Sequence, residues 1–81
     1  MQKSSTRMNP AQKVMLRDFN SQFFNLTEKY WNPSDSDAYW DALTDDAMEL
    51  INKFQTSDVK LNNYIQSIVA TFLNSREDML A

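Results

Sequence analysis

SDAYWDALTDDAMELINKF, residues 36–54, places its large apolar side chains at intervals of three and four residues. These intervals put the side chains on one side of an amphipathic helix. The stretch begins with Ser and Asp, which are typical N-cap residues, and acidic residues in a first turn suit the helix dipole. We therefore expect a helix over about 36–55. Its apolar stripe consists of Trp40, Leu43, Ala47, Leu50 and Phe54.

The residues before this stretch repeat the same pattern. Asn9 followed by Pro10 is a typical helix start, with Asn as the N-cap and Pro in the first turn. Pro33 disfavours helical geometry at Asn32 and so marks the end. We therefore expect a first helix over about 10–31. Its apolar stripe consists of Leu16, Phe19, Phe23, Leu26 and Tyr30.

The residues after this stretch predict a third helix over about 58–74, with Leu61, Ile65, Ile68 and Phe72 on its stripe. Short links make successive helices antiparallel neighbours. The predicted fold is a small all-α antiparallel three-helix bundle over residues 9–75. A flexible N-terminal tail at 1–8 and a C-terminal tail at 76–81 complete the chain. A helical hairpin completed by dimerisation stays open, because the first helix carries apolar residues on more than one side.

The composition excludes several kinds of chemistry. The 81 residues include no Gly, no Cys and no His. The chain therefore lacks disulfides, thiolate nucleophiles, the commonest general base and the commonest metal ligand. Asp35 and Asp37 resemble the start of a calcium loop, but Trp40 stands where that loop requires Gly. We expect no enzyme activity, no cofactor and no metal site.

A candidate binding face lies on the second predicted helix. Four acidic residues follow one another at intervals of four, which brings them together on the helix surface, where like charges repel. Aromatic residues flank the first link, and Trp and Tyr are common anchors in protein interfaces. We expect this face to bind a protein partner with a basic surface, although a solvated helix face and a core cap would give the same pattern. The face consists of Asp37, Asp41, Asp45, Glu49, Trp31, Tyr39 and Trp40.

The charge is divided unevenly along the chain. Residues 1–17 carry four basic and no acidic side chains, whereas the remaining residues carry all eleven acids. A basic arm of this kind is an alternative site for nucleic acid. The runs of Lys and Arg that mark such sites are missing, so the pattern disfavours this alternative. The residues concerned are Lys3, Arg7, Lys13 and Arg17.

No run of about 18 apolar residues is present, so we expect no transmembrane helix and no membrane partner. The basic residues of 1–7 are not followed by an apolar segment, which is unlike a secretory signal. The expected location is the cytoplasm. A structural homo-oligomer, in which the chain is an assembly subunit, stays open as a third function.

The aromatic pattern Tyr30-Trp31-Asn32-Pro33, followed by Tyr39-Trp40-Asp41 and Lys53-Phe54, carries a resemblance. Residues 19–73 are similar to short helical proteins of unknown function encoded by phages and integrative elements of Gram-positive bacteria. The resemblance implies an accessory protein that acts by binding and carries no site residues over. Together with the charge pattern, it predicts a non-catalytic protein–protein interaction module.

Overall fold

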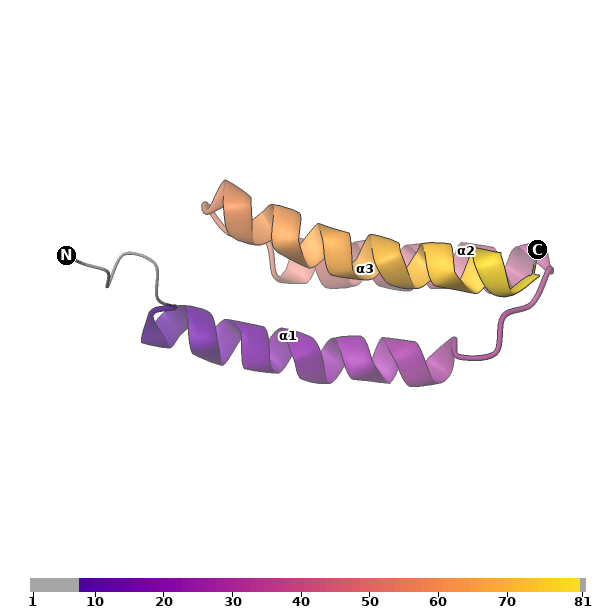
Figure 1. The fold of residues 1–81 in the computed structure, drawn as a ribbon, viewed down its shortest axis with the longest axis horizontal. Coiled ribbons are helices and arrows are strands. Elements are labelled where there is room, and N and C mark those ends of the chain that lie inside the picture. The colour runs from indigo at the N-terminus through magenta and orange to yellow at the C-terminus, as the bar shows by residue number, and fades with distance from the viewer. Residues whose placement is uncertain (1–7, 81) are drawn as a thin grey trace.

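The computed structural model describes residues 8–80, which form three helices and no strand. The helices are α1 (Pro10–Lys29), α2 (Asp37–Lys53) and α3 (Val59–Leu80). Figure 1 shows α2 running back beside α1 and α3 returning beside α2. This arrangement confirms the predicted all-α three-helix bundle. Of the predicted N-terminal tail, residues 1–7 lie outside the described residues.

Each helix begins at a side-chain cap. The Asn9 side chain accepts a hydrogen bond from the Gln12 backbone N–H at 2.8 Å, and the Gln12 side chain accepts one from the Asn9 N–H at 3.0 Å. Ser36 Oγ accepts from the Tyr39 N–H at 3.2 Å. Asp58 Oδ1 accepts from the Leu61 N–H at 3.3 Å. These bonds satisfy N–H groups that a helix start leaves without partners, so the caps fix where each helix begins.

The core lies along the axis of the bundle. The apolar stripes of the three helices meet there, and four side chains, Phe19, Leu43, Ile65 and Val69, have almost no exposed surface. Phe19 stacks on Phe23 and meets Phe54 edge to face, with ring centroids 5.8 and 5.6 Å apart. The buried hydrophobic residues are Leu16, Phe19, Leu26, Tyr30, Leu43, Ala47, Leu50, Phe54, Ile65, Val69 and Phe72.

Three helix ends differ from the sequence prediction. We expected the second helix to reach residue 55, but α2 ends at Lys53. We expected the first helix to reach residue 31, but it ends at Lys29, and Tyr30 caps it through a hydrogen bond from its N–H to the Leu26 carbonyl. We expected a C-terminal tail at 76–81, but α3 continues to Leu80. The continuation follows from Arg76, whose side chain is buried against the end of α1 and so holds the last turns of α3 in the bundle.

The three helices do not contact one another equally. Both α1 and α3 pack closely on α2, whereas the backbones of α1 and α3 lie further apart and leave a groove between them. Within residues 8–80, no helix has both the length and the apolar character needed to cross a bilayer.

Candidate binding surfaces

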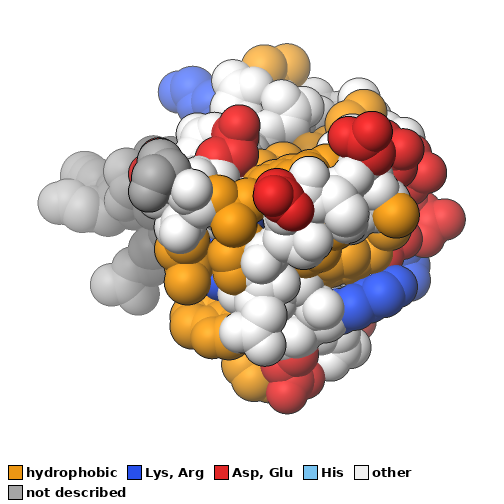
Figure 2. All heavy atoms as spheres, turned by 90° about the vertical axis from the view of Figure 1, so that its right-hand side faces the viewer, with side chains coloured by type: hydrophobic (Ala, Val, Ile, Leu, Met, Phe, Trp, Pro, Cys, Tyr) orange, Lys and Arg blue, Asp and Glu red, His pale blue; other side chains and the backbone are white. Residues whose placement is uncertain are grey.

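The acidic row, which we define as Asp37, Asp41, Asp45 and Glu49, lies on the solvent side of α2. All four side chains are exposed. A helix rises about 6 Å over four residues, so the row extends for about 18 Å. None of the four forms an ion pair within 4.0 Å with a cation of residues 8–80, where the single ion pair joins Lys29 to Asp46. Acidic side chains gather at the edge of the molecule formed by α2 (Figure 2).

The acidic row turns gradually around the axis of α2 from Asp37 to Glu49. Four residues advance a helix by slightly more than one turn, so each acid is displaced by about 40° from the previous one. Glu49 consequently reaches the α1–α2 boundary, where it lines a shallow pocket with Lys29 and Lys53. Asp45 and Glu49 also border a second hollow beside Met48, which is 52% exposed. An exposed apolar side chain therefore borders the acidic row.

Asp46, the acid next to the row, has a structural role instead. Its Oδ2 accepts hydrogen bonds from the Tyr30 hydroxyl at 2.5 Å and from Lys29 Nζ at 3.0 Å. These bonds, that from Tyr30 above all, hold the pKa of Asp46 below its ordinary value. Burial and the hydrogen bond to Asp46 raise the pKa of Tyr30. This carboxylate therefore ties α2 to the end of α1.

The structure separates the aromatic members of the predicted face from the acidic row. Tyr39 and Trp40 are half-buried against the core, with their rings edge to face at 5.0 Å. The Tyr39 hydroxyl donates to the Tyr30 carbonyl at 2.6 Å, and burial raises the pKa of Tyr39. These two rings therefore hold the start of α2 against the end of α1.

Trp31 lies elsewhere, on the α1–α3 groove. Its side chain is 53% exposed, and the guanidinium of Arg76 stacks on its ring at 4.5 Å. Arg76 Nη1 donates to the Trp31 carbonyl. Arg76 was not among the residues predicted to form a site. A signal was present, because residue 76 continues the buried positions 65, 69 and 72 in steps of four, three and four.

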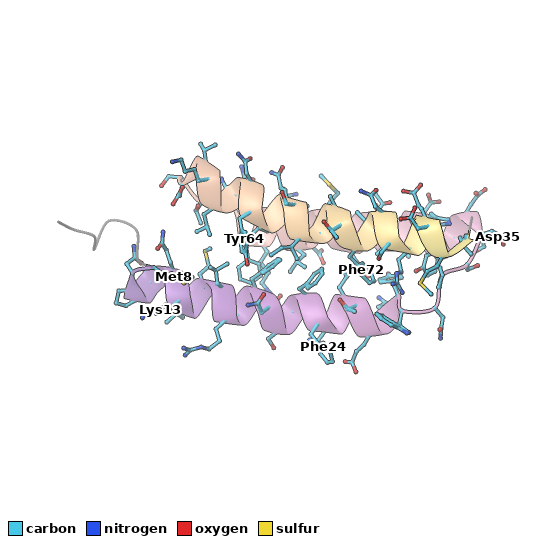
Figure 3. All side chains as sticks on the ribbon, viewed as in Figure 1. Met8, Lys13, Phe24, Asp35, Tyr64 and Phe72 are labelled. Atoms are coloured by element: carbon cyan, nitrogen blue, oxygen red, sulfur yellow. The ribbon has the colours of Figure 1, made fainter. Side chains whose placement is uncertain are left out.

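The α1–α3 groove has a volume of about 490 Å³. Figure 3 shows Tyr64 and Phe72 projecting from α3 toward α1, whereas Phe24 points away from α3. Phe24 is 59% exposed, so Phe23 is the inward-facing residue of this adjacent pair. The groove is lined by Phe23, Thr27, Trp31, Tyr64, Ser67, Ile68, Thr71, Phe72, Ser75 and Arg76.

The alternative nucleic-acid site is described only in part. Lys3 and Arg7 lie outside the described residues, whereas Lys13 and Arg17 are exposed on α1. Residues 8–80 contain no group of three acidic side chains placed to hold a metal ion.

Comparison with known proteins gives no relative: no family model, curated protein or solved structure matches the chain.

Proposed function

We propose that this chain is a non-catalytic protein-interaction module and that the acidic row binds a basic protein surface. The observation that carries the proposal is a row of four exposed carboxylates with no cation of residues 8–80 paired to them. Neighbouring like charges at this spacing destabilise a helix by a few tenths of a kcal/mol per pair, and the charge of a basic partner would remove that repulsion.

The surface offers both charge and apolar area. A continuous line of one charge sign raises the association rate with an oppositely charged partner. Met48 adds a flexible apolar contact beside the carboxylates, of the kind common at adaptable binding surfaces. We assign Tyr39 and Trp40 to the support of this face, because their rings pack on the core and fix the N-terminal end of α2.

Affinity capture with charge-reversed variants tests the proposal. The full chain serves as bait in nuclease-treated lysate of its source cells, beside the variant Asp41→Lys with Asp45→Lys. The matched control is Asp18→Lys with Glu28→Lys, which changes the net charge equally on the exposed side of α1. Quantitative mass spectrometry then compares the captured proteins, and circular dichroism checks that each variant is folded.

We expect one stoichiometric protein partner that the control retains and the α2 variant loses. A partner retained equally by both variants would contradict the assignment to the acidic row. Capture only from lysate without nuclease would favour the nucleic-acid alternative, and a light-scattering mass above that of the monomer would favour the homo-oligomer.

The cytoplasmic location and the resemblance to phage and integrative-element proteins stay predictions. Fractionation of the source cells tests the first.

A further inference from the structure

The α1–α3 groove has an apolar floor. Phe23 of α1 and Phe72 of α3 meet edge to face at 5.9 Å, and Ile68 lies one turn before Phe72. From Tyr64 to Arg76 the lining follows α3 for twelve residues, which corresponds to a length of about 18 Å. The floor therefore presents apolar surface along three turns of a helix.

Small hydroxyl side chains form much of the walls, and their hydrogen bonds are made within their own helices. Thr27 Oγ1 donates to the Phe23 carbonyl at 2.9 Å, and Thr71 Oγ1 donates to the Ser67 carbonyl at 2.8 Å. Ser75 Oγ donates to the Phe72 carbonyl at 2.6 Å. The hydroxyl protons of these three side chains are thus already donated, and the small size of the side chains leaves room for an apolar element to approach closely.

Arg76 is the one charged residue of the lining. It is only 5% exposed, and its guanidinium stacks on Trp31 and on Phe72, at 4.5 and 4.9 Å from the ring centroids. Nη1 donates to the Trp31 carbonyl and Nε to Ser75 Oγ. A guanidinium carries five N–H donors, and the others have no acceptor in residues 8–80, where no carboxylate lies within 4.0 Å of Arg76.

A buried cation with free donors is best satisfied by a carboxylate, which accepts two parallel N–H bonds from a guanidinium. The groove thus combines an apolar floor three turns long with a positive charge at one end that has no carboxylate partner among residues 8–80. A symmetric pair of chains joined through this groove would offer Arg76 no carboxylate, because Arg76 is the one charged residue of the lining.

We propose that the α1–α3 groove binds one amphipathic helix of a protein partner, with its apolar stripe on Phe23, Ile68 and Phe72. An Asp or Glu at the end of that stripe pairs with Arg76. The bound helix completes a four-helix arrangement, in which each helix covers the apolar sides of its neighbours. This site is separate from the acidic row and opposite to it in charge preference, so it does not depend on the proposed function.

A displayed library of helical peptides of about 18 residues tests the proposal against the full chain. Each peptide carries a Leu and Ala stripe, and the positions at both ends of the stripe sample Asp, Glu, Asn, Gln and Lys. The blocking variant is Thr71→Trp, which fills the groove from an exposed position of α3. The matched control is Ala70→Trp, an exposed neighbour on the same helix that does not line the groove.

We expect selected peptides to carry Asp or Glu at one end of the stripe and to bind the Ala70→Trp chain as well as the unchanged one. Thr71→Trp should abolish binding. Replacing the selected Glu by Gln should weaken binding by about tenfold or more, because a buried charge-assisted pair is lost. In the Arg76→Gln chain, the Glu and Gln peptides should bind with equal affinity. If Arg76→Gln does not fold, the Thr71→Trp comparison still tests the proposal.

Three results would overturn the proposal. The first is a selection without any binder sensitive to Thr71→Trp. The second is a groove binder that tolerates Gln in place of Glu. The third concerns dodecanoate, a lipid-like carboxylate, titrated in a parallel experiment. If no peptide is selected, but dodecanoate binds and Thr71→Trp blocks this binding, the groove is a site for a lipid-like carboxylate.

Discussion

The Asp46 carboxylate connects α2 to the end of α1 through two side chains, Lys29 in its last turn and the C-cap Tyr30. Tyr30 and Lys29 both donate hydrogen bonds to the same oxygen, Oδ2. Asp46→Ala should lower the free energy of unfolding by about 1 kcal/mol at pH 7, a value reduced for the partial exposure of the carboxylate. Urea denaturation measures this change, with Asp45→Ala as the matched control because Asp45 is the exposed neighbour on the same helix.

The same residue predicts a dependence of stability on pH. The pKa of Asp46 lies below its ordinary value of 3.8, so the folded chain holds this proton less tightly than the unfolded chain does. Its contribution is therefore complete above that ordinary value and is lost as the pH falls through the folded-state pKa. The difference in unfolding free energy between Asp46→Ala and Asp45→Ala should shrink over this range. A difference that stays constant down to pH 2 would contradict the assigned role.

At the scale of single residues, the sequence predicted which side chains are exposed better than it predicted which residues they contact. The exposed positions of the acidic row follow from the helical period alone. The sequence left open whether Phe23 or Phe24 points inward, because this depends on where α3 lies. In the structure Phe23 packs against the core and Phe24 is exposed. The helical period gave a signal for the burial of Arg76, but its partner, the Trp31 carbonyl 45 residues earlier in the chain, could not be predicted from the sequence.

At the scale of elements, α2 carries a charge pattern that opposes its own stability. Neutralising two adjacent members of the acidic row, with Asp41→Asn and Asp45→Asn, should raise the free energy of unfolding by a few tenths of a kcal/mol. Thermal unfolding at low salt measures this gain. The gain should disappear in about 1 M salt, where charges about 6 Å apart are screened.

The control for this prediction is Asp18→Asn with Glu28→Gln, two acids of α1 that lie ten residues apart and do not repel each other on one face. An equal gain in this control would show that net charge, and not the row, sets the effect.

Helix starts were predicted well because Asn9, Ser36 and Asp58 act locally, through caps within three residues. Helix ends were predicted less well. The end of α1 depends on side chains of the other two helices. Tyr39 of α2 donates a hydrogen bond to the Tyr30 carbonyl, and Arg76 of α3 donates one to the Trp31 carbonyl.

At the scale of the whole molecule, one small core carries the fold. Leu43 belongs to the α2 stripe and has no exposed surface. Leu43→Ala should lower the free energy of unfolding by about 2–5 kcal/mol, which is a large share of the stability of a domain this small. Chemical denaturation measures the loss. Met48→Ala, an exposed change on the same helix, should have an effect below about 0.5 kcal/mol.

The bundle and its helix order followed from periodicity and short links, so the fold class was predictable from sequence. The α1–α3 groove could not be predicted from the sequence, because the distance between two helices depends on how all three pack. The predicted face was also divided by packing: the acidic row stayed on the surface, while Tyr39 and Trp40 turned to the core and Trp31 to the groove.

The most direct test of the central claim, that the acidic row binds a protein partner, is carboxyl footprinting. Carbodiimide coupling to glycine ethyl ester labels exposed acids, and mass spectrometry compares the purified chain with the chain in nuclease-treated lysate of its source cells. We predict that the acidic row is labelled several-fold more slowly in lysate, whereas Asp18 and Glu28 on α1 are labelled at unchanged rates. If the acidic row is labelled at the same rate in both samples, the claim is contradicted. This holds whether or not the labelling of Asp18 and Glu28 changes.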